Sequence, residues 1–280
     1  MTIGEALARA AMRLGEAGIE RPQAEARILL EAASGRGRGQ IIAFPEQALT
    51  AAQAELFERM VSRRCAREPV SRILGSREFW SLRFAVGPAT LDPRPDSETL
   101  VAAVLARIPE RSAKLAILDL GTGTGCLLLA LLSELPQATG LGVDVDPAAR
   151  DIAARNAETL GLQARAAFQV GDWARGIAAA FDVIVSNPPY IESTAIDTLA
   201  PEVAQYDPPG ALDGGMDGLS AYRALMPQAA QRLKPGGLLA LEIGAGQGAA
   251  VRGLAENAGL TDLATAQDLA GIERCLLFSR

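Results

Sequence analysis

The chain has 280 residues, and its 49% hydrophobic and 21% charged residues are typical of a soluble globular protein. It contains no histidine, which excludes Ser-His-Asp and Cys-His nucleophile systems, His-ligated metals and an imidazole base. Three widely spaced cysteines, Cys65, Cys126 and Cys275, indicate neither a zinc site nor a disulfide framework. We therefore expect a cytoplasmic protein without a metal.

The net charge of −6 is unevenly distributed, because residues 1–90 hold 13 arginines and 10 glutamates while the remainder is acidic. DNA-binding enzymes usually show a much stronger basic stripe, so we expect no direct binding of nucleic acid. No apolar run approaches the roughly 18 residues of a membrane span, and the N-terminus lacks a signal-peptide pattern. A monomer that is neither exported nor associated with membranes is expected.

The first 75 residues show the periodicity of helices only. Apolar residues recur at three- and four-residue spacing from Ile3 to Leu14 and from Ala24 to Ala32. Thr50 and Gln53 have the spacing of a capping box, which predicts a third helix that runs through Met60. The pattern indicates a small helical bundle.

The period then changes, and the residues from Phe79 to Val86 predict a short β-hairpin. We expect a helical domain over 1–75, a hairpin linker over 76–92 and a larger domain over 93–280. Helix and strand patterns alternate in the larger domain, which predicts an α/β fold with a mostly parallel sheet between helices. Ligands of such sheets bind at the carboxyl ends of the strands.

In this larger domain, Asp96 is expected to cap a helix that runs to Ile108. Further helices are predicted at 126–135, 148–160, 219–233 and 248–258. Strands are predicted at 115–118, 139–143, 166–170, 181–185, 238–243 and 274–278.

A glycine-rich loop joins the first of these strands to the following helix. Its predicted cofactor-binding members are Asp119, Gly121, Thr122, Gly123, Thr124 and Gly125. Glycines there let the backbone approach a ligand at a helix N-terminus, although a tight turn without a ligand gives the same pattern. Because Cys126 stands three residues after Gly123, the spacing departs from the dinucleotide fingerprint and suits a ligand without a pyrophosphate.

Acidic residues follow the next two strands. Asp144 can accept hydrogen bonds from both hydroxyls of a ribose, the alternative being a helix cap before Pro147. Asp172 and Trp173 offer an acceptor for an adenine amine and an apolar wall for its ring, unless they form an ordinary turn. Together with the glycine loop, these residues resemble the S-adenosylmethionine pocket of Rossmann-like methyltransferases.

Asn187, Pro188, Pro189 and Tyr190 follow the strand at 181–185 and predict a rigid rim of hydrogen-bond acceptors. The Asn187 side-chain carbonyl and the Pro188 backbone carbonyl can hold a planar NH₂ group, on which Tyr190 can stack. The nitrogen then faces a sulfonium methyl in line, and no strong base is needed. We predict Asn187, Pro188 and Tyr190 as catalytic, and all four as substrate-binding. Adenine or guanine amines and the glutamine amide all fit this rim.

These motifs, with residues 77–98, 211–219 and 241–244, resemble the peptide chain release factor glutamine methyltransferases of the HemK/PrmC type over nearly the whole chain. The resemblance implies a Rossmann-like class I methyltransferase domain that a hairpin joins to a helical bundle. It also implies S-adenosylmethionine as cofactor, with S-adenosylhomocysteine as product. The implied substrate is the glutamine amide nitrogen (N5) in the Gly-Gly-Gln motif of class 1 release factors.

The resemblance further implies that residues 121–125, Asp144, Trp173 and Asn187 contact the cofactor. Two positions depart from the family pattern, since Asp92 replaces an aliphatic residue and Ser97 replaces a threonine. Residues 93–98, which include Arg94, are expected near the mouth of the site, with no chemical role predicted.

Three alternatives stay open at this point. Enzymes that methylate a glutamine of a ribosomal protein share most of these motifs, although the pattern over residues 21–30 favours release factors. A nucleic-acid amine methyltransferase is opposed by the acidic charge. A non-catalytic module that docks translation factors is opposed by the intact glycine, acid and Asn-Pro-Pro-Tyr elements.

Overall fold

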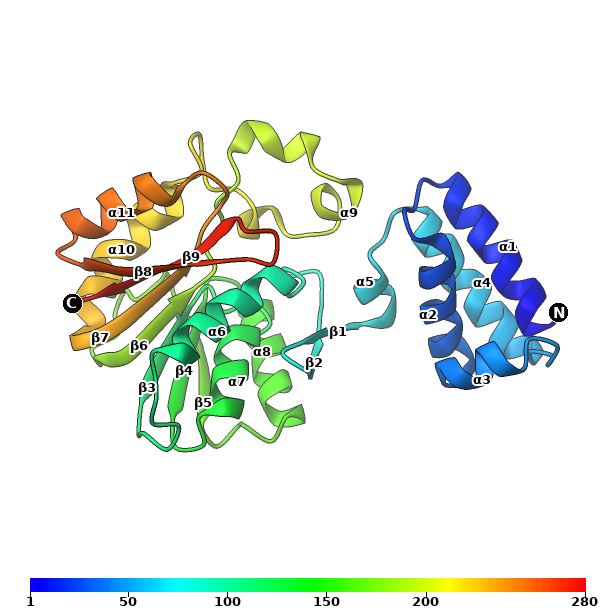
Figure 1. The fold of residues 1–280 in the computed structure, drawn as a ribbon, viewed down its shortest axis with the longest axis horizontal. Coiled ribbons are helices and arrows are strands. Elements are labelled where there is room, and N and C mark those ends of the chain that lie inside the picture. Colours follow the sequence, from blue (N-terminus) through cyan, green and yellow to red (C-terminus); the bar gives the residue numbers. More distant parts are fainter. The chain divides into compact units, whose positions relative to one another are not determined.

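The computed structural model describes residues 1–280, and the chain folds into two compact units (Figure 1). A helical unit consists of Met1–Ser76 and Ala200–Tyr206, and a larger unit consists of Arg77–Leu199 and Asp207–Arg280. The domain limits expected at residues 75 and 92 stay predictions. None of the helices combines the length and the apolar composition that a membrane span requires.

The helical unit is a bundle around one apolar core, to which Ile3, Leu14, Leu29 and Phe57 contribute fully buried side chains. Its helices are α1 (Ile3–Glu16), α2 (Pro22–Ser34), α3 (Arg38–Ala43), α4 (Ala51–Cys65), α5 (Val70–Leu74) and α9 (Pro201–Ala204). The capping box predicted at Thr50 begins α4, as the sequence indicated. The three predicted helices are confirmed, whereas α3 and α5 are too short for periodicity to find.

A buried ion-pair cluster ties the later segment Ala200–Tyr206 to this bundle. The side chain of Arg64 is 7% exposed, and its guanidinium donates to Glu25 Oε2 at 2.5 Å and to Glu202 Oε1 at 2.9 Å. Arg67 also donates to Glu202, at 2.8 Å. The Tyr206 hydroxyl donates to the carbonyl of the C-cap residue of α4 at 2.8 Å. Nothing in the sequence pattern indicated that this segment belongs to the helical unit.

We expect Arg64→Ala to destabilise the helical unit by about 3 kcal/mol, because Glu25 then keeps a largely buried charge without a partner and Glu202 keeps only Arg67. Hydrogen exchange of the α4 amides measures this change. Arg59→Ala is the matched control, since Arg59 is 59% exposed and pairs with Glu55 on the same helix. Equal losses of protection in the two variants would contradict the importance of the cluster.

The predicted hairpin is present as β1 (Ser76–Phe79) and β2 (Leu82–Ala85). Its two turn residues, Trp80 and Ser81, have φ angles of 52° and 57°, which match the right-handed twist of a two-residue hairpin. Such angles strain residues other than glycine. The Trp80 indole donates to Glu134 Oε1 at 2.9 Å, which fixes this turn.

The larger unit contains a seven-stranded sheet in the order β5-β4-β3-β6-β7-β9-β8. Its strands are β3 (Ala116–Leu120), β4 (Thr139–Asp144), β5 (Ala166–Val170), β6 (Phe181–Ser186), β7 (Leu233–Glu242), β8 (Thr261–Gln267) and β9 (Glu273–Ser279). The first five strands of this order pair in parallel, and β9 is antiparallel to β7 and β8. The expected α/β fold with a mostly parallel sheet is confirmed.

Helices cover both faces of this sheet (Figure 1). One face packs against α6 (Glu98–Ala106), α7 (Cys126–Glu134) and α8 (Pro147–Thr159), and the other packs against α10 (Ser220–Arg232) and α11 (Gly248–Asn257). Ile117 faces the first core and Leu118 the second, because successive side chains of a strand alternate. Short 3-10 turns lie at Pro95–Ser97, Ser193–Thr198 and Pro209–Ala211.

The cap predicted at Asp96 is wrong. The turn Pro95–Ser97 precedes α6, which begins at Glu98 without a side-chain cap, and Asp96 lies inside that turn. Proline at the first position of the turn suits this tighter geometry, because its φ is already fixed.

Candidate active site

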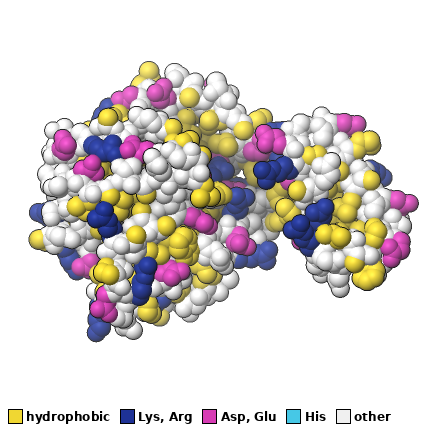
Figure 2. All heavy atoms as spheres, in the orientation of Figure 1, with side chains coloured by type: hydrophobic (Ala, Val, Ile, Leu, Met, Phe, Trp, Pro, Cys, Tyr) yellow, Lys and Arg dark blue, Asp and Glu magenta, His cyan; other side chains and the backbone are white.

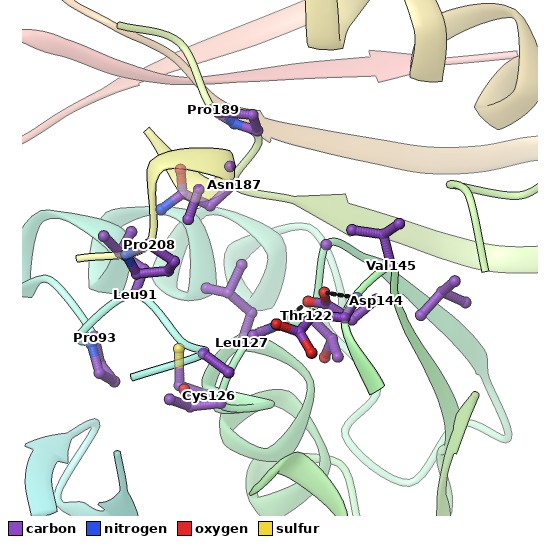
Figure 3. Close-up of a pocket in the computed structure, with 18 of the residues that line it drawn as sticks. Leu91, Pro93, Thr122, Cys126, Leu127, Asp144, Val145, Asn187, Pro189 and Pro208 are labelled. Atoms are coloured by element: carbon purple, nitrogen blue, oxygen red, sulfur yellow. Dashed lines mark hydrogen bonds between the residues drawn. The ribbon is translucent and has the colours of Figure 1, made fainter. Parts of the chain in front are cut away.

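A cavity of about 380 Å³ opens at the carboxyl ends of β3, β4 and β6 in the larger unit (Figure 3). This volume is within the range of small-molecule sites. Nine of the predicted site residues line it, namely Gly121, Thr122, Gly123, Thr124, Asp144, Asp172, Trp173, Asn187 and Pro189. Residues that are far apart in the sequence therefore meet at the carboxyl ends of the parallel strands, where ligands of such sheets bind.

Four predicted residues do not line the cavity. Asp119 is fully buried, Gly125 is the N-cap residue of α7, and Pro188 is buried. Tyr190 is partly buried, and its hydroxyl donates to a carboxylate oxygen of Glu242 at 3.3 Å. The roles assigned to these residues stay predictions.

The glycine loop is held in place by backbone hydrogen bonds. The N–H groups of Gly121 and Thr122 both donate to the carbonyl of Val143, each at 2.9 Å. Gly121, Gly123 and Gly125 have φ angles of 71°, 54° and 80°, which residues with a Cβ rarely adopt. A Cβ at Gly125 would also lie 3.2 Å from side chains of α7 and α8. The loop therefore presents its backbone to the cavity.

Asp144 ends β4 and faces this loop. Its Oδ2 accepts the N–H of Gly123 at 2.8 Å, and its Oδ1 accepts that of Asp146 at 3.0 Å. Burial raises the pKa of Asp144, while these two backbone donors lower it. Each oxygen keeps further acceptor capacity. The helix-cap alternative for Asp144 is wrong, because Asp146 caps α8 by accepting from Ala148 N at 2.7 Å.

Asp119 places a second carboxyl behind the loop. Its Oδ2 accepts the Thr122 hydroxyl at 2.6 Å, and its Oδ1 has no hydrogen-bond partner. Burial raises the pKa of Asp119 to about 7, against the lowering effect of the Thr122 hydroxyl. A buried carboxyl with an open acceptor favours a nearby cation or donor.

An apolar wall and a more exposed acid complete this part of the cavity. Trp173 has a φ of 53°. A Cβ added at Gly121 would lie 3.5 Å from its ring, so the ring packs closely against the glycine loop. The side chain of Val145 also lines the cavity and is 74% exposed, although sequence reasoning did not select it. Its position directly after Asp144 was the available signal. The half-exposed Asp172 pairs with Arg175 at 3.2 Å.

The segment before α6, which had no predicted role, forms another wall. It contributes Leu91, Asp92, Pro93, Arg94 and Ser97. Because these residues line the cavity, the structure supports the expectation that the segment lies near the mouth of the site.

This wall contains a buried acidic side chain, Asp92, and an arginine, Arg94, that is held in an ion pair. Asp92 is 4% exposed. Arg94 forms an ion pair with the buried Asp207, so it is not a free cation for a substrate. A third side chain, Ser97, accepts a hydrogen bond from Asn187 Nδ2 at 3.2 Å.

Asn156 is a structural residue that sequence reasoning missed. It is 1% exposed on α8, and its Oδ1 accepts from Ala85 N at 2.8 Å. Its Nδ2 donates to the carbonyls of Ala85 and Thr124 at 3.1 and 2.9 Å. One amide thereby connects the hairpin to the glycine loop. No short motif marks it, because the partners are distant in sequence.

This sheet, with a glycine loop after β3, an acid at the end of β4 and Asn-Pro-Pro-Tyr after β6, defines an S-adenosylmethionine-dependent methyltransferase. A crystal structure of a methyltransferase from Pyrococcus furiosus has a similar fold, with a TM-score of 0.52, 19% identity and coverage of 71% of this chain and 88% of that one. Residues 5–75 match the PrmC N-terminal domain, and residues 96–205 match the methyltransferase small domain.

The release factor glutamine methyltransferase of Rhodospirillum rubrum is 50% identical over 280 residues, which cover 100% of this chain and 86% of the relative. That of Caulobacter vibrioides is 45% identical over 278 residues, covering 99% and 96%. The chain belongs to the family of release factor glutamine methyltransferases.

We expect the free energy of unfolding to fall as the pH rises from about 4 to about 7, by up to about 1.4 kcal/mol per pH unit for Asp119. The native state keeps this carboxyl protonated up to about pH 7, whereas the unfolded chain releases the proton near pH 4. Asp119→Asn should flatten this dependence in urea denaturation at several pH values. The exposed Asp151→Asn is the control, and an unchanged slope in Asp119→Asn would refute the assignment.

Proposed function

We propose that this chain transfers the methyl group of S-adenosylmethionine to the side-chain amide nitrogen of the glutamine in the Gly-Gly-Gln motif of class 1 release factors. One observation carries the proposal: Asn187 and Pro189 line the same cavity as the glycine loop and Asp144. Figure 3 shows that the first pair enters from the loop after β6, and Asp144 and Val145 from the end of β4. Membership of the family supports the substrate class.

The donor set fits the proposed cofactor. Asp144 has acceptor capacity for the ribose hydroxyls, and Asp172 for the adenine amine. Trp173 and Val145 give the adenine ring apolar walls.

When bound, S-adenosylmethionine supplies a sulfonium-activated methyl group. Asn187 Oδ1 and the Pro188 carbonyl accept hydrogen bonds from the glutamine NH₂ and orient its nitrogen. These acceptors stabilise the N–H groups as they become more acidic during methyl transfer, and the proton is then lost to water. The chain achieves this without histidine, since no group with the basicity of an imidazole is required.

The surface does not favour the nucleic-acid alternative. Figure 2 shows basic side chains interspersed with acidic ones over the visible face of the larger unit. The net charge of −6 is also unfavourable for binding a polyanion. A substrate of tripeptide size offers little area for specificity, so we propose that the helical unit supplies a second contact patch for the release factor.

We expect an unmodified class 1 release factor, incubated with the enzyme and S-adenosylmethionine, to gain one methyl group on the glutamine of its Gly-Gly-Gln motif. Fragmentation mass spectrometry locates the modification. A release factor with that glutamine replaced should stay unmodified. Methylation of that variant, or of a ribosomal protein in its place, would contradict the proposed substrate.

Asn187→Ala should lower kcat by about 10²-fold, because it removes an acceptor that stabilises the reacting amide. The fold should stay intact, which thermal unfolding checks. Ser193→Ala is a suitable control, since this exposed hydroxyl bonds only to Asp213 in the segment after the motif. Turnover of Asn187→Ala at the wild-type rate would refute the role of this residue.

A further inference from the structure

Glu242 is a buried carboxyl next to the Asn-Pro-Pro-Tyr motif. It ends β7, and its place is fixed by strand pairing, because Ser186 of β6 lies opposite Leu241. Asn187 directly follows Ser186, and Glu242 directly follows Leu241. The two residues therefore lie at neighbouring positions at the carboxyl ends of adjacent parallel strands. The side chain is 1% exposed and carries no part of the chemistry proposed above.

Both oxygens of this carboxyl accept hydrogen bonds from residues at the site. The Ser97 hydroxyl donates to Oε2 at 2.5 Å, and the Tyr190 hydroxyl donates to Oε1 at 3.3 Å. Ser97 Oγ in turn accepts from Asn187 Nδ2 at 3.2 Å. One carboxylate thus contacts Tyr190 directly and Asn187 through one hydroxyl.

The direction of this chain follows from the number of donors. Above about pH 7 the Glu242 carboxyl is ionised and only accepts, and a serine hydroxyl has a single proton, which Ser97 gives to Glu242. Ser97 therefore has only lone pairs left for Asn187, which must turn its NH₂ group toward Ser97. The Asn187 oxygen then points away from Ser97 and stays available to another donor.

We propose that Glu242 and Ser97 are positioning residues, which hold the Asn187 amide with its oxygen toward the substrate nitrogen. The inference rests on the proposed function, in which Asn187 accepts from the glutamine NH₂. If the amide turned by 180°, it would present an NH₂ group to the NH₂ group of the substrate. The second contact of Glu242 holds the phenol of Tyr190, which is the last residue of the same motif.

The surroundings of Glu242 are consistent with this role. Burial raises the pKa of Glu242 to about 7, while the Ser97 hydroxyl, Arg274 and the Tyr190 hydroxyl favour the ionised form. Asp96 opposes them. A buried carboxyl with such opposing influences has a cost in stability, which a role in the site would explain.

The test compares Ser97→Ala with Ser97→Thr and with the matched control Ser186→Ala. Ser186 is also buried, and its hydroxyl donates to the Leu120 carbonyl at 2.6 Å, so both alanine variants lose one buried hydroxyl. We expect kcat on the release factor to fall at least tenfold in Ser97→Ala and to stay within twofold in Ser186→Ala. Ser97→Thr should restore most of the activity, since it keeps the hydroxyl.

A second readout does not depend on activity. The Asn187 NH₂ signal in a ¹H–¹⁵N spectrum, assigned by its loss in Asn187→Asp, should exchange slowly with water in the wild type. Exchange should accelerate in Ser97→Ala and in Glu242→Leu, but not in Ser186→Ala. The double variant Ser97→Ala/Glu242→Leu should lose no more activity than the worse single variant, because both act through one chain.

Wild-type kcat and slow exchange in Ser97→Ala would overturn the proposal, as would equal losses in Ser97→Ala and Ser186→Ala. If the wild type does not methylate a release factor, the proposed function fails. The exchange of the Asn187 amide still decides whether Ser97 and Glu242 orient that side chain.

Discussion

The site depends on one carbonyl oxygen at the end of β4. The Val143 carbonyl accepts the N–H groups of Gly121 and Thr122, which bends the glycine loop back onto the neighbouring strand. In this conformation Gly123 N donates to the Asp144 carboxylate. The bonds to Val143 are made by backbone atoms alone, so the loop depends on the φ angles that glycine permits more than on particular side chains.

Much of the fold could be predicted, because hydrophobic periodicity reflects burial. The strand expected at 166–170 matches β5, and the helix at 126–135 matches α7 within one residue. β8 (Thr261–Gln267) was missed, since its mostly exposed small and polar residues lack the apolar pattern of a buried strand. β7 begins at Leu233, whereas the sequence predicted a start at 238. Its first half contains Pro235 and two glycines, which are unusual in a strand, so the apolar pattern did not extend to it.

The site also contains features that the sequence could predict and features that it could not. The glycine loop, Asp144 and Asn187 could be selected from the sequence because each follows a strand, and parallel strands bring such positions to one edge. The contact between Ser97 and Glu242 could not be predicted, although both lie in segments that the sequence analysis noted, since their hydrogen bond joins positions 145 residues apart. Only the three-dimensional pairing of β6 with β7 brings Glu242 beside the motif.

The ion pair between Arg64 and Glu202 joins residues 138 positions apart, and this separation affects the order of folding during synthesis. At about 5–20 residues per second, Glu202 leaves the ribosome roughly 7 to 30 seconds after Arg64. During that interval the bundle of α1 to α5 has Glu25 as the acidic partner of Arg64. The first unit to be synthesised is therefore completed only when most of the second unit has followed it.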